Sequence, residues 1–453
     1  MQPATREIWI NRYREAMPLE EIKRRATLKA EPVRGLAPLA LEVARLRLEI
    51  GLSGVFYPTT QACEFIQSQI ERALAHCLRE YEDPHHLLKN AYSDTPVLCD
   101  PYMPTLLTGL AGVGKTQLRL AIGRVLHGRG AVLLDDFHPT VPLIDYAEAG
   151  VGAQRSIAAV LRSLAGPEIA RGTVRVRESE LPRKCSKWLR ICGTCLIGVD
   201  ETQFIAQSSD ASTLITRTLL ALADIRIPWF AIANYSLCWK LLGRSAEAKQ
   251  RLLGRPYVFF PDAPDSADWL AVLAEFGVVG SDAFDFDLTK HGRALWNLSA
   301  GLKRELVKLL VQAYCVARRR RCEKATWADV QTAFASPEFS ASRADINSLI
   351  AHAAQGGVLQ KDLLCPFEQT AGEAGTQYYF HLREARAGVF AKEIIQSSMN
   401  GAERRALAVF QRADTSSPLG TNEKVLPIKK RTRPSLEDLI QAGRIARERR
   451  GRP

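Results

Sequence analysis

One segment of the chain combines glycines, a lysine and a threonine at the spacing that phosphate binding requires. The pattern G-x-x-x-x-G-K-[ST] is matched in full by Gly109-Leu110-Ala111-Gly112-Val113-Gly114-Lys115-Thr116. Glycines let backbone N–H groups curl around phosphates, and the N-terminus of a following helix favours the same negative charge. We expect Lys115 to reach the terminal phosphates and Thr116 to ligate Mg²⁺, with Gln117 in the same nucleotide-binding set.

A second candidate follows 85 residues after Lys115, where the apolar strand 195–199 ends in Asp200 and Glu201. Open parallel sheets bind ligands at the carboxyl ends of their strands. Asp200 is expected to act with Thr116 on the Mg²⁺ shell, and Glu201 to orient and polarise the attacking water. Two acids after a strand are common, but their distance from the glycine-rich segment makes the pair specific. The two motifs together predict binding and hydrolysis of ATP with Mg²⁺. A glycine-rich turn that matches by chance is the alternative.

Three polar residues near the end of the α/β region extend this candidate site. Asn234 follows the apolar strand 229–233, where it would help to position the attacking water; an ordinary loop asparagine is the alternative. Arg251 and Arg255 lie between the next helix and the next strand, where an arginine can reach the γ-phosphate of a neighbouring subunit. Solvated charge is the alternative for both. The predicted catalytic set is therefore Glu201, Asn234 and Arg251.

The elements that must position these residues follow from the apolar spacing. From residue 101, short apolar strands alternate with helices, which predicts a parallel sheet with helices on both faces. The strands are expected at 103–108, 131–137, 195–199, 229–233 and 257–260. After residue 264 the strands stop, and four helices are predicted between 268 and 334. Lys303 and Arg304 open the third of these helices, where they would touch nucleotide from above or be surface charge.

The fold class predicted from this pattern is α/β, with a parallel-sheet nucleotide-binding core followed by an α-helical lid. Residues 338–423 read as mixed and mostly helical, with no assigned role. The domain prediction is a helical N-terminal extension at 1–100, an α/β ATPase core at 101–264, an α-helical lid at 265–337, a C-terminal region at 338–423 and a basic, disordered tail at 424–453.

The formal net charge of +12 points to an acidic partner, most simply nucleic acid. Residues 424–453 carry ten Lys/Arg and three Asp/Glu, a net of +7, which leaves only +5 for the other 423 residues. The charge of residues 1–423, the body of the chain, therefore does not by itself indicate DNA binding. A run of four arginines, 318–321, ends a predicted helix, where solvated charge is at least as good an interpretation as a DNA contact.

The remaining composition is that of a soluble cytoplasmic protein with no membrane partner. No apolar stretch approaches the length of a membrane span, and the N-terminus has no apolar core like that of a signal peptide. Ten cysteines fit this compartment if they are reduced. Cys185, Cys192 and Cys195 are the nearest approach to a zinc cluster, but a structural zinc site needs four ligands. Reduced packing cysteines are the preferred interpretation.

With these residues in place, the chain resembles the TnsC/TniB group of AAA+ transposition regulators over residues 50–335. The resemblance rests on the glycine-rich segment, on the segment 195–204 ending Asp-Glu-Thr-Gln-Phe, on residues 227–234, and on Leu298 to Leu302 with 326–334 as the lid. Val55-Phe56-Tyr57-Pro58 is similar to the N-terminal part of TnsC proteins. Gly198, a small residue inside the apolar strand, departs from the pattern and puts the packing of that strand in question.

The resemblance implies a protein that assembles on double-stranded DNA as ATP-bound rings or filaments. Such a homo-oligomer links a target-selecting protein to the transposase. A helicase or replication loader of the same superfamily, and a signalling NTPase that does not touch DNA, are the alternatives. Candidate DNA contacts lie between the second and third predicted strands: Arg155, Arg162, Arg183, Lys184 and Lys187.

Overall fold

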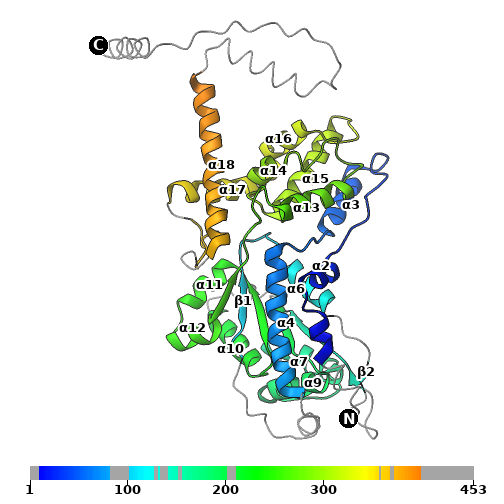
Figure 1. Ribbon diagram of the computed structural model, residues 1–453, viewed down its shortest axis with the longest axis vertical. Coiled ribbons are helices and arrows are strands. Elements are labelled where there is room, and N and C mark those ends of the chain that lie inside the picture. Colours follow the sequence, from blue (N-terminus) through cyan, green and yellow to red (C-terminus); the bar gives the residue numbers. More distant parts are fainter. Residues whose placement is uncertain are drawn as a thin grey trace, which may run out of the picture. The chain divides into compact units, whose positions relative to one another are not determined.

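The computed structural model describes residues 10–81, 102–126, 131–132, 141–150, 156–200, 211–356, 359–367 and 372–398. It divides into two compact units, Met1–Ile394 and Ile395–Pro453, and every element that builds the candidate site belongs to the first (Figure 1). Within the described ranges, no helix has both the length and the apolar character that crossing a membrane requires.

The core of the first unit is a five-stranded sheet in which every pair of neighbouring strands is parallel. Strands β1, β5 and β6 are buried at every residue, which explains why each one reads as an unbroken apolar run. The parallel α/β core predicted from the sequence is thereby confirmed. In spatial order the strands are β4 (Tyr146–Gly150), β5 (Leu196–Asp200), β6 (Trp229–Ala233), β1 (Thr105–Thr108) and β7 (Arg255–Val258).

The strand beside β5 differs from the one expected at 131–137. Only β2 (Ala131–Val132) is described there, and it pairs antiparallel with β3 (Val141–Pro142) in a separate two-stranded sheet. On the side away from β6, β5 pairs with β4, whose sequence YAEAG has no apolar run. β4 is last in the strand order, and although Tyr146, Ala147 and Ala149 are buried, the exposed Glu148 interrupts the apolar pattern. Residues 133–137 lie outside the described ranges.

Gly198 in β5 makes room for a side chain of β4. A Cβ atom at this position would lie 1.9 Å from the hydroxyl oxygen of Tyr146 and 2.8 Å from the ring of Phe230. The rings of Tyr146 and Phe230 are parallel, with centroids 6.2 Å apart. The small residue is therefore a requirement of strand packing, because the tyrosine ring occupies the space of a side chain.

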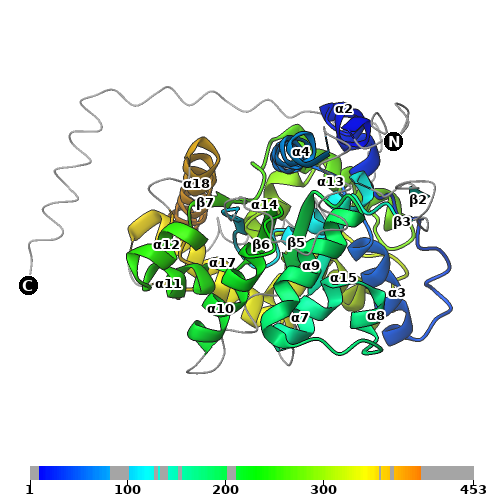
Figure 2. The ribbon, with the colours of Figure 1, turned by 90° about the horizontal axis from the view of Figure 1, so that it is seen from below.

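Helices cover both faces of the sheet, as Figure 2 shows. Leu107 of β1 packs in one hydrophobic cluster, with α4 and α6, whereas Leu106 packs in a second cluster with α7 and α9. Successive side chains of a strand point to opposite faces, which separates the two clusters. The helices around the core are α2 (Leu19–Ala26), α4 (Thr60–Tyr81), α6 (Lys115–Val125), α7 (Ile157–Leu164), α8 (Pro167–Ala170), α9 (Leu181–Ile191), α10 (Ala211–Ala223), α11 (Tyr235–Leu242) and α12 (Ala246–Leu252), whereas α3 (Leu41–Ser53) packs against the helices of the lid.

Hydroxyl side chains cap the first turn of several of these helices. The Thr59 hydroxyl accepts a hydrogen bond from the Ala62 amide at the start of α4 (3.3 Å). Ser156 does the same for Ala159 at the start of α7 (3.2 Å). Such caps satisfy amide groups that have no partner inside the helix.

The four helices predicted for the lid are present: α13 (Ala267–Val279), α14 (Gly292–Ser299), α15 (Lys303–Arg319) and α16 (Trp327–Ala335). A turn precedes α14, in which Asp287 accepts hydrogen bonds from the amide and hydroxyl of Thr289. In the described part of the region beyond the lid lie two long helices, α17 (Ser340–Gln355) and α18 (Gly372–Ser398).

Candidate active site

A cavity of about 700 Å³ lies where the glycine-rich segment, the lid and the N-terminal segment meet. It brings together most of the residues that the sequence assigns to nucleotide. Among the lining residues are Ala111 to Gln117, Asp200 and Asn234 from the core, Lys303, Arg304 and Lys308 from the lid, and Val55, Phe56 and Tyr57 from the N-terminal segment.

Lys115 is only 7% exposed, at the first position of α6. Its ammonium group donates hydrogen bonds to the carbonyl oxygens of Gly109 and Leu110, each at 2.8 Å. Burial, and then the charge of Arg304, lower the pKa of Lys115 to about 7. Gly109 and Leu110 therefore contribute to the site by holding the lysine, and both lie at the end of the strand β1 that delivers the loop.

The backbone of the glycine-rich segment takes conformations that suit glycine. Gly112 and Gly114 have φ of 89° and 113°. A Cβ at Gly112 would lie 2.9 Å from Cβ of Arg304, so the glycine lets the lid approach the loop closely. The amide of Arg304 also donates to the Gly112 carbonyl (3.2 Å). Glycine is needed here both for the left-handed backbone and for the contact with the lid.

Asp200 is buried at the end of β5 and lines the cavity. It accepts a hydrogen bond from Nε of Arg119 (3.1 Å), and Arg119 also pairs with Glu148 of β4. Arg119 was not predicted from the sequence. Its position four residues after Lys115, on the same face of α6, is the signal that could have identified it. Glu201, the predicted water-activating residue, lies outside the described residues.

Asn234 occupies the N-cap position of α11 and lines the cavity. Its side chain makes no capping hydrogen bond to that helix. The amide group is therefore not used by the helix that it begins, which suits a role toward a ligand. Its role in positioning water stays a prediction.

Arg251 and Arg255 are not among the residues that line the cavity. Arg251 lies on α12 with its side chain 62% exposed, and it pairs with Glu247 one helical turn away (3.2 Å). Arg255 is exposed at the first residue of β7. Neither can serve the cavity of its own chain in this arrangement, so a catalytic role for either requires a second subunit.

The lid contributes cations directly to the cavity. Lys303 pairs with Asp262 (3.3 Å), and Arg304 lies against Gly112. Among the described residues, four cations, Lys115, Lys303, Arg304 and Lys308, line the cavity against two acids, Glu49 and Asp200. Apolar residues, among them Leu52, Phe56, Phe259 and Phe276, line it as well. A cavity with this lining can accommodate both the phosphates and the base of a nucleotide.

Lys115 gives a pH prediction for nucleotide binding. With a pKa of about 7, the ligand-free lysine is mostly neutral at pH 8, and bound phosphates favour its charged form. Binding of Mg-ATP is therefore expected to take up close to one proton at pH 8 and almost none at pH 6. Affinity should rise as pH falls from about 9 to 7 and then level off. Calorimetry in buffers of different ionisation enthalpy measures the uptake, and near-zero uptake at both pH values would contradict the lowered pKa.

No protein-family model and no curated protein matches the chain. Solved structures that it is similar to include the Aeropyrum pernix ORC1 protein in complex with DNA, with 18% identity, 68% of this chain and 82% of that chain covered, and a TM-score of 0.36. The Aeropyrum pernix ORC2 protein with ADPNP and ADP has 15% identity, 72% and 84% coverage, and a TM-score of 0.40. The RuvB Holliday junction branch migration motor of Thermotoga maritima is 12% identical, with 62% of this chain and 78% of that chain covered and a TM-score of 0.32. At these values the similarity assigns no role to any residue of this chain. The chain has the predicted architecture, a parallel α/β core followed by an α-helical lid.

Proposed function

We propose that the chain is an AAA+ ATPase that binds double-stranded DNA as an ATP-dependent assembly and regulates DNA transposition. The observation that carries the ATPase part is the convergence of Lys115, Asp200 and Arg304 on one cavity. These residues come from the glycine-rich segment, the end of a buried strand and the lid. If the glycine-rich segment matched the motif only by chance, there would be no reason for Asp200 and Arg304, which are distant from it in the chain, to line the same cavity.

The groups lining the cavity suit a magnesium nucleotide. Backbone amides of the glycine-rich loop, together with Lys115 and Arg304, would hold the phosphates. The Thr116 hydroxyl and the Asp200 carboxylate are hard oxygen ligands of the kind that Mg²⁺ prefers, and both line the cavity. Bound Mg²⁺ would neutralise negative charge on the phosphates. Glu201 would orient the attacking water, with Asn234 beside the γ-phosphate.

Hydrolysis would need a neighbouring subunit, because Arg251 does not reach the cavity of its own chain. An exposed arginine on α12 is available to a second copy, where it would stabilise charge on the transferring phosphoryl group. The ATP-bound state would therefore favour assembly, since the arginine of one subunit contacts the γ-phosphate of the next. In this arrangement, the oligomeric state of the protein would depend on which nucleotide is bound.

Assembly would in turn make DNA binding strong. A body with a net charge of +5 neutralises few phosphates as a monomer, whereas a ring or filament repeats its cations along the duplex. Among the candidate contacts, Arg162, Arg183 and Lys184 are exposed and Lys187 is half-buried. Arg155 and the basic tail 424–453 lie outside the described residues.

The test is DNA binding as a function of nucleotide and salt. Binding to duplex DNA should require ATP or a non-hydrolysable analogue, show little sequence preference and weaken steeply with salt, with a slope of log K of about −0.9 per phosphate neutralised. Glu201→Gln should hold the assembled state, because it binds ATP without hydrolysing it. Filter binding and electron microscopy measure affinity and assembly. Equal affinity with and without nucleotide, and no oligomers, would favour the signalling NTPase.

The transposition part of the proposal rests on the resemblance to the TnsC/TniB group. A transposase gene beside this one, and stimulation of that transposase by the ATP-bound protein, would separate this function from the alternative of a helicase or replication loader. ATP-driven strand separation without any effect on the transposase would favour that alternative.

A further inference from the structure

Two of the three lid cations of the cavity, Lys303 and Arg304, follow a turn of unusual backbone conformation. Ala300 and Gly301, between α14 and α15, have φ of 51° and 71°. The left-handed region is unfavourable for alanine, so its surroundings must stabilise this conformation. Gly301 has no space for a side chain, because a Cβ there would lie 2.5 Å from Nε1 of Trp296 and 2.8 Å from Cβ of Pro261.

This turn determines where Lys303 and Arg304 point. Arg304 is fixed against the glycine-rich loop by the hydrogen bond from its amide to the Gly112 carbonyl (3.2 Å). Lys303 is held by Asp262 (3.3 Å). Both cations lie within four residues of Ala300, so a rotation of the turn would withdraw them from the cavity together.

Tyr378 of α18 contacts the turn directly. Its side chain is buried, and its hydroxyl donates a hydrogen bond to the carbonyl of Ala300 (3.2 Å). The ring centroid of Tyr378 lies 5.9 Å from the ring of Trp296 in α14 and 5.9 Å from that of Phe260, which follows β7. Tyr378 thus joins α18 to the lid and to the segment that leads out of the core.

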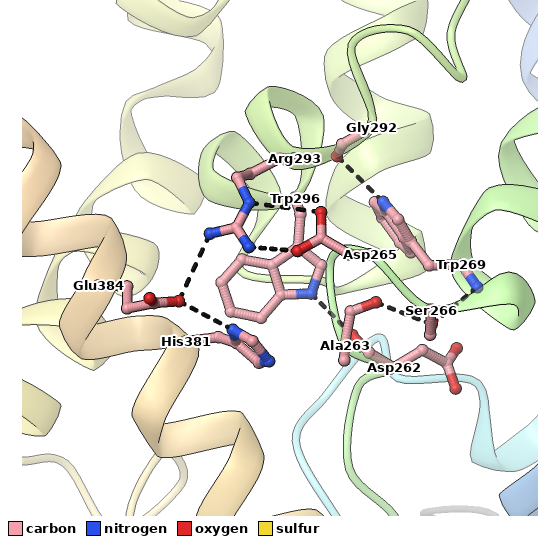
Figure 3. Close-up of polar contacts among 10 residues, drawn as sticks. All are labelled: Asp262, Ala263, Asp265, Ser266, Trp269, Gly292, Arg293, Trp296, His381 and Glu384. Atoms are coloured by element: carbon pink, nitrogen blue, oxygen red, sulfur yellow. Dashed lines mark hydrogen bonds and ion pairs between the residues drawn. The ribbon is translucent and has the colours of Figure 1, made fainter.

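Figure 3 shows the polar contacts of Trp296 and Arg293 of α14, including an ion pair to α18. The indole of Trp296 donates to the carbonyl of Asp262 (2.8 Å), the residue that pairs with Lys303. Arg293 of α14 pairs with Asp265 and with Glu384 of α18. The ion pairs of Arg293 are exposed and contribute little. The buried hydrogen bond of Tyr378 is therefore the contact through which α18 acts on the turn.

We propose that Tyr378 is a positioning residue of the nucleotide site, and that α18 is thereby coupled to nucleotide binding. The inference rests on the proposed function, since it takes the cavity to be a nucleotide site. Tyr378 is not among the residues lining the cavity and acts through Lys303 and Arg304. Because linked equilibria are reciprocal, bound nucleotide strengthens the docking of α18 by the factor by which docking strengthens nucleotide binding.

Tyr378→Phe tests the positioning role. It removes one buried hydrogen bond and is expected to weaken binding of a non-hydrolysable ATP analogue by about three- to tenfold. In an assembly that hydrolyses ATP, KM should rise while kcat stays near wild type, as for a contact made equally in ground and transition states. The matched control is Tyr81→Phe, because the Tyr81 hydroxyl donates to the Arg190 carbonyl (2.9 Å) outside the cavity. The control should lower Tm to a similar extent and leave analogue affinity unchanged.

A double-mutant cycle separates positioning from general destabilisation. In a background of Lys303→Ala with Arg304→Ala, Tyr378→Phe should no longer change the affinity for the analogue, because its effect passes through those side chains. The same loss in both backgrounds would overturn the proposal, as would a Tyr378→Phe variant that binds like Tyr81→Phe. A wild-type chain that binds no analogue would instead refute the nucleotide site itself.

Hydrogen exchange tests the reciprocal direction. A saturating ATP analogue should slow amide exchange in residues 372–387 of the wild-type chain, and slow it less in Tyr378→Phe. Exchange in this segment that does not respond to the analogue would contradict the coupling.

Discussion

Lys115→Ala is expected to weaken ATP binding by at least about 100-fold, because truncating one partner of a buried, charge-assisted contact commonly has an effect of this size. Phosphates entering the cavity would lose the cation at the start of α6, and the neighbouring lid cations cannot occupy its position. Hydrolysis should fall to background with it. Equilibrium titration with a fluorescent ATP analogue measures the loss.

The same substitution should not unfold the protein. The pKa of Lys115 is lowered to about 7 from an ordinary value of 10.5, so between these values the unfolded chain binds the extra proton. The buried lysine therefore opposes folding at pH 7, and this effect decreases as the pH rises toward 10.5. We expect Lys115→Ala to have a Tm no lower than wild type at pH 7. Lys290→Ala, an exposed lysine of the lid, is the control that should keep ATP affinity. Wild-type affinity in Lys115→Ala would contradict the assigned nucleotide site.

Arg251→Ala is expected to bind ATP normally and to lose hydrolysis by on the order of 1,000-fold or more, the range for an arginine supplied in trans. Its side chain is exposed and does not line the cavity, so the binding groups of its own chain remain intact. Mixing Arg251→Ala with Lys115→Ala should restore part of the activity, because one chain supplies the arginine and the other the complete cavity. Turnover assays over a range of mixing ratios measure this recovery.

The control for this prediction is Glu247→Ala, which removes the partner of Arg251 and keeps the arginine. An exposed ion pair one turn apart on a helix contributes little, so this variant should fold and hydrolyse ATP. If no mixing ratio recovers activity, Arg251 is not the residue that acts in trans, and Arg255 becomes the residue to test.

The elements of the core could be predicted from the sequence because their signals are local. A strand buried on both faces needs an unbroken apolar run, and 195–199 and 229–233 have one; their strands are observed at Leu196–Asp200 and Trp229–Ala233. The glycine-rich loop could be predicted because its backbone conformation requires glycine at particular positions, and the sequence shows those glycines directly. β4 was missed because its buried residues are small or aromatic and its sequence is interrupted by the exposed Glu148, so it contains no apolar run.

By itself, the sequence determined the parallel α/β core, the helical lid and the glycine-rich loop that is proposed to bind phosphate, because each signal lies within a few neighbouring positions. Only the tertiary structure decided which residues from distant parts of the chain contact these elements. Arg119 pairs with Asp200, Arg304 lies against Gly112, and Tyr378 reaches the Ala300 carbonyl. The residues of each pair are separated by between 78 and 192 positions in the chain. Such contacts arise from the packing of whole helices, and of these residues only Arg119 has a signal in the local spacing, four residues after Lys115.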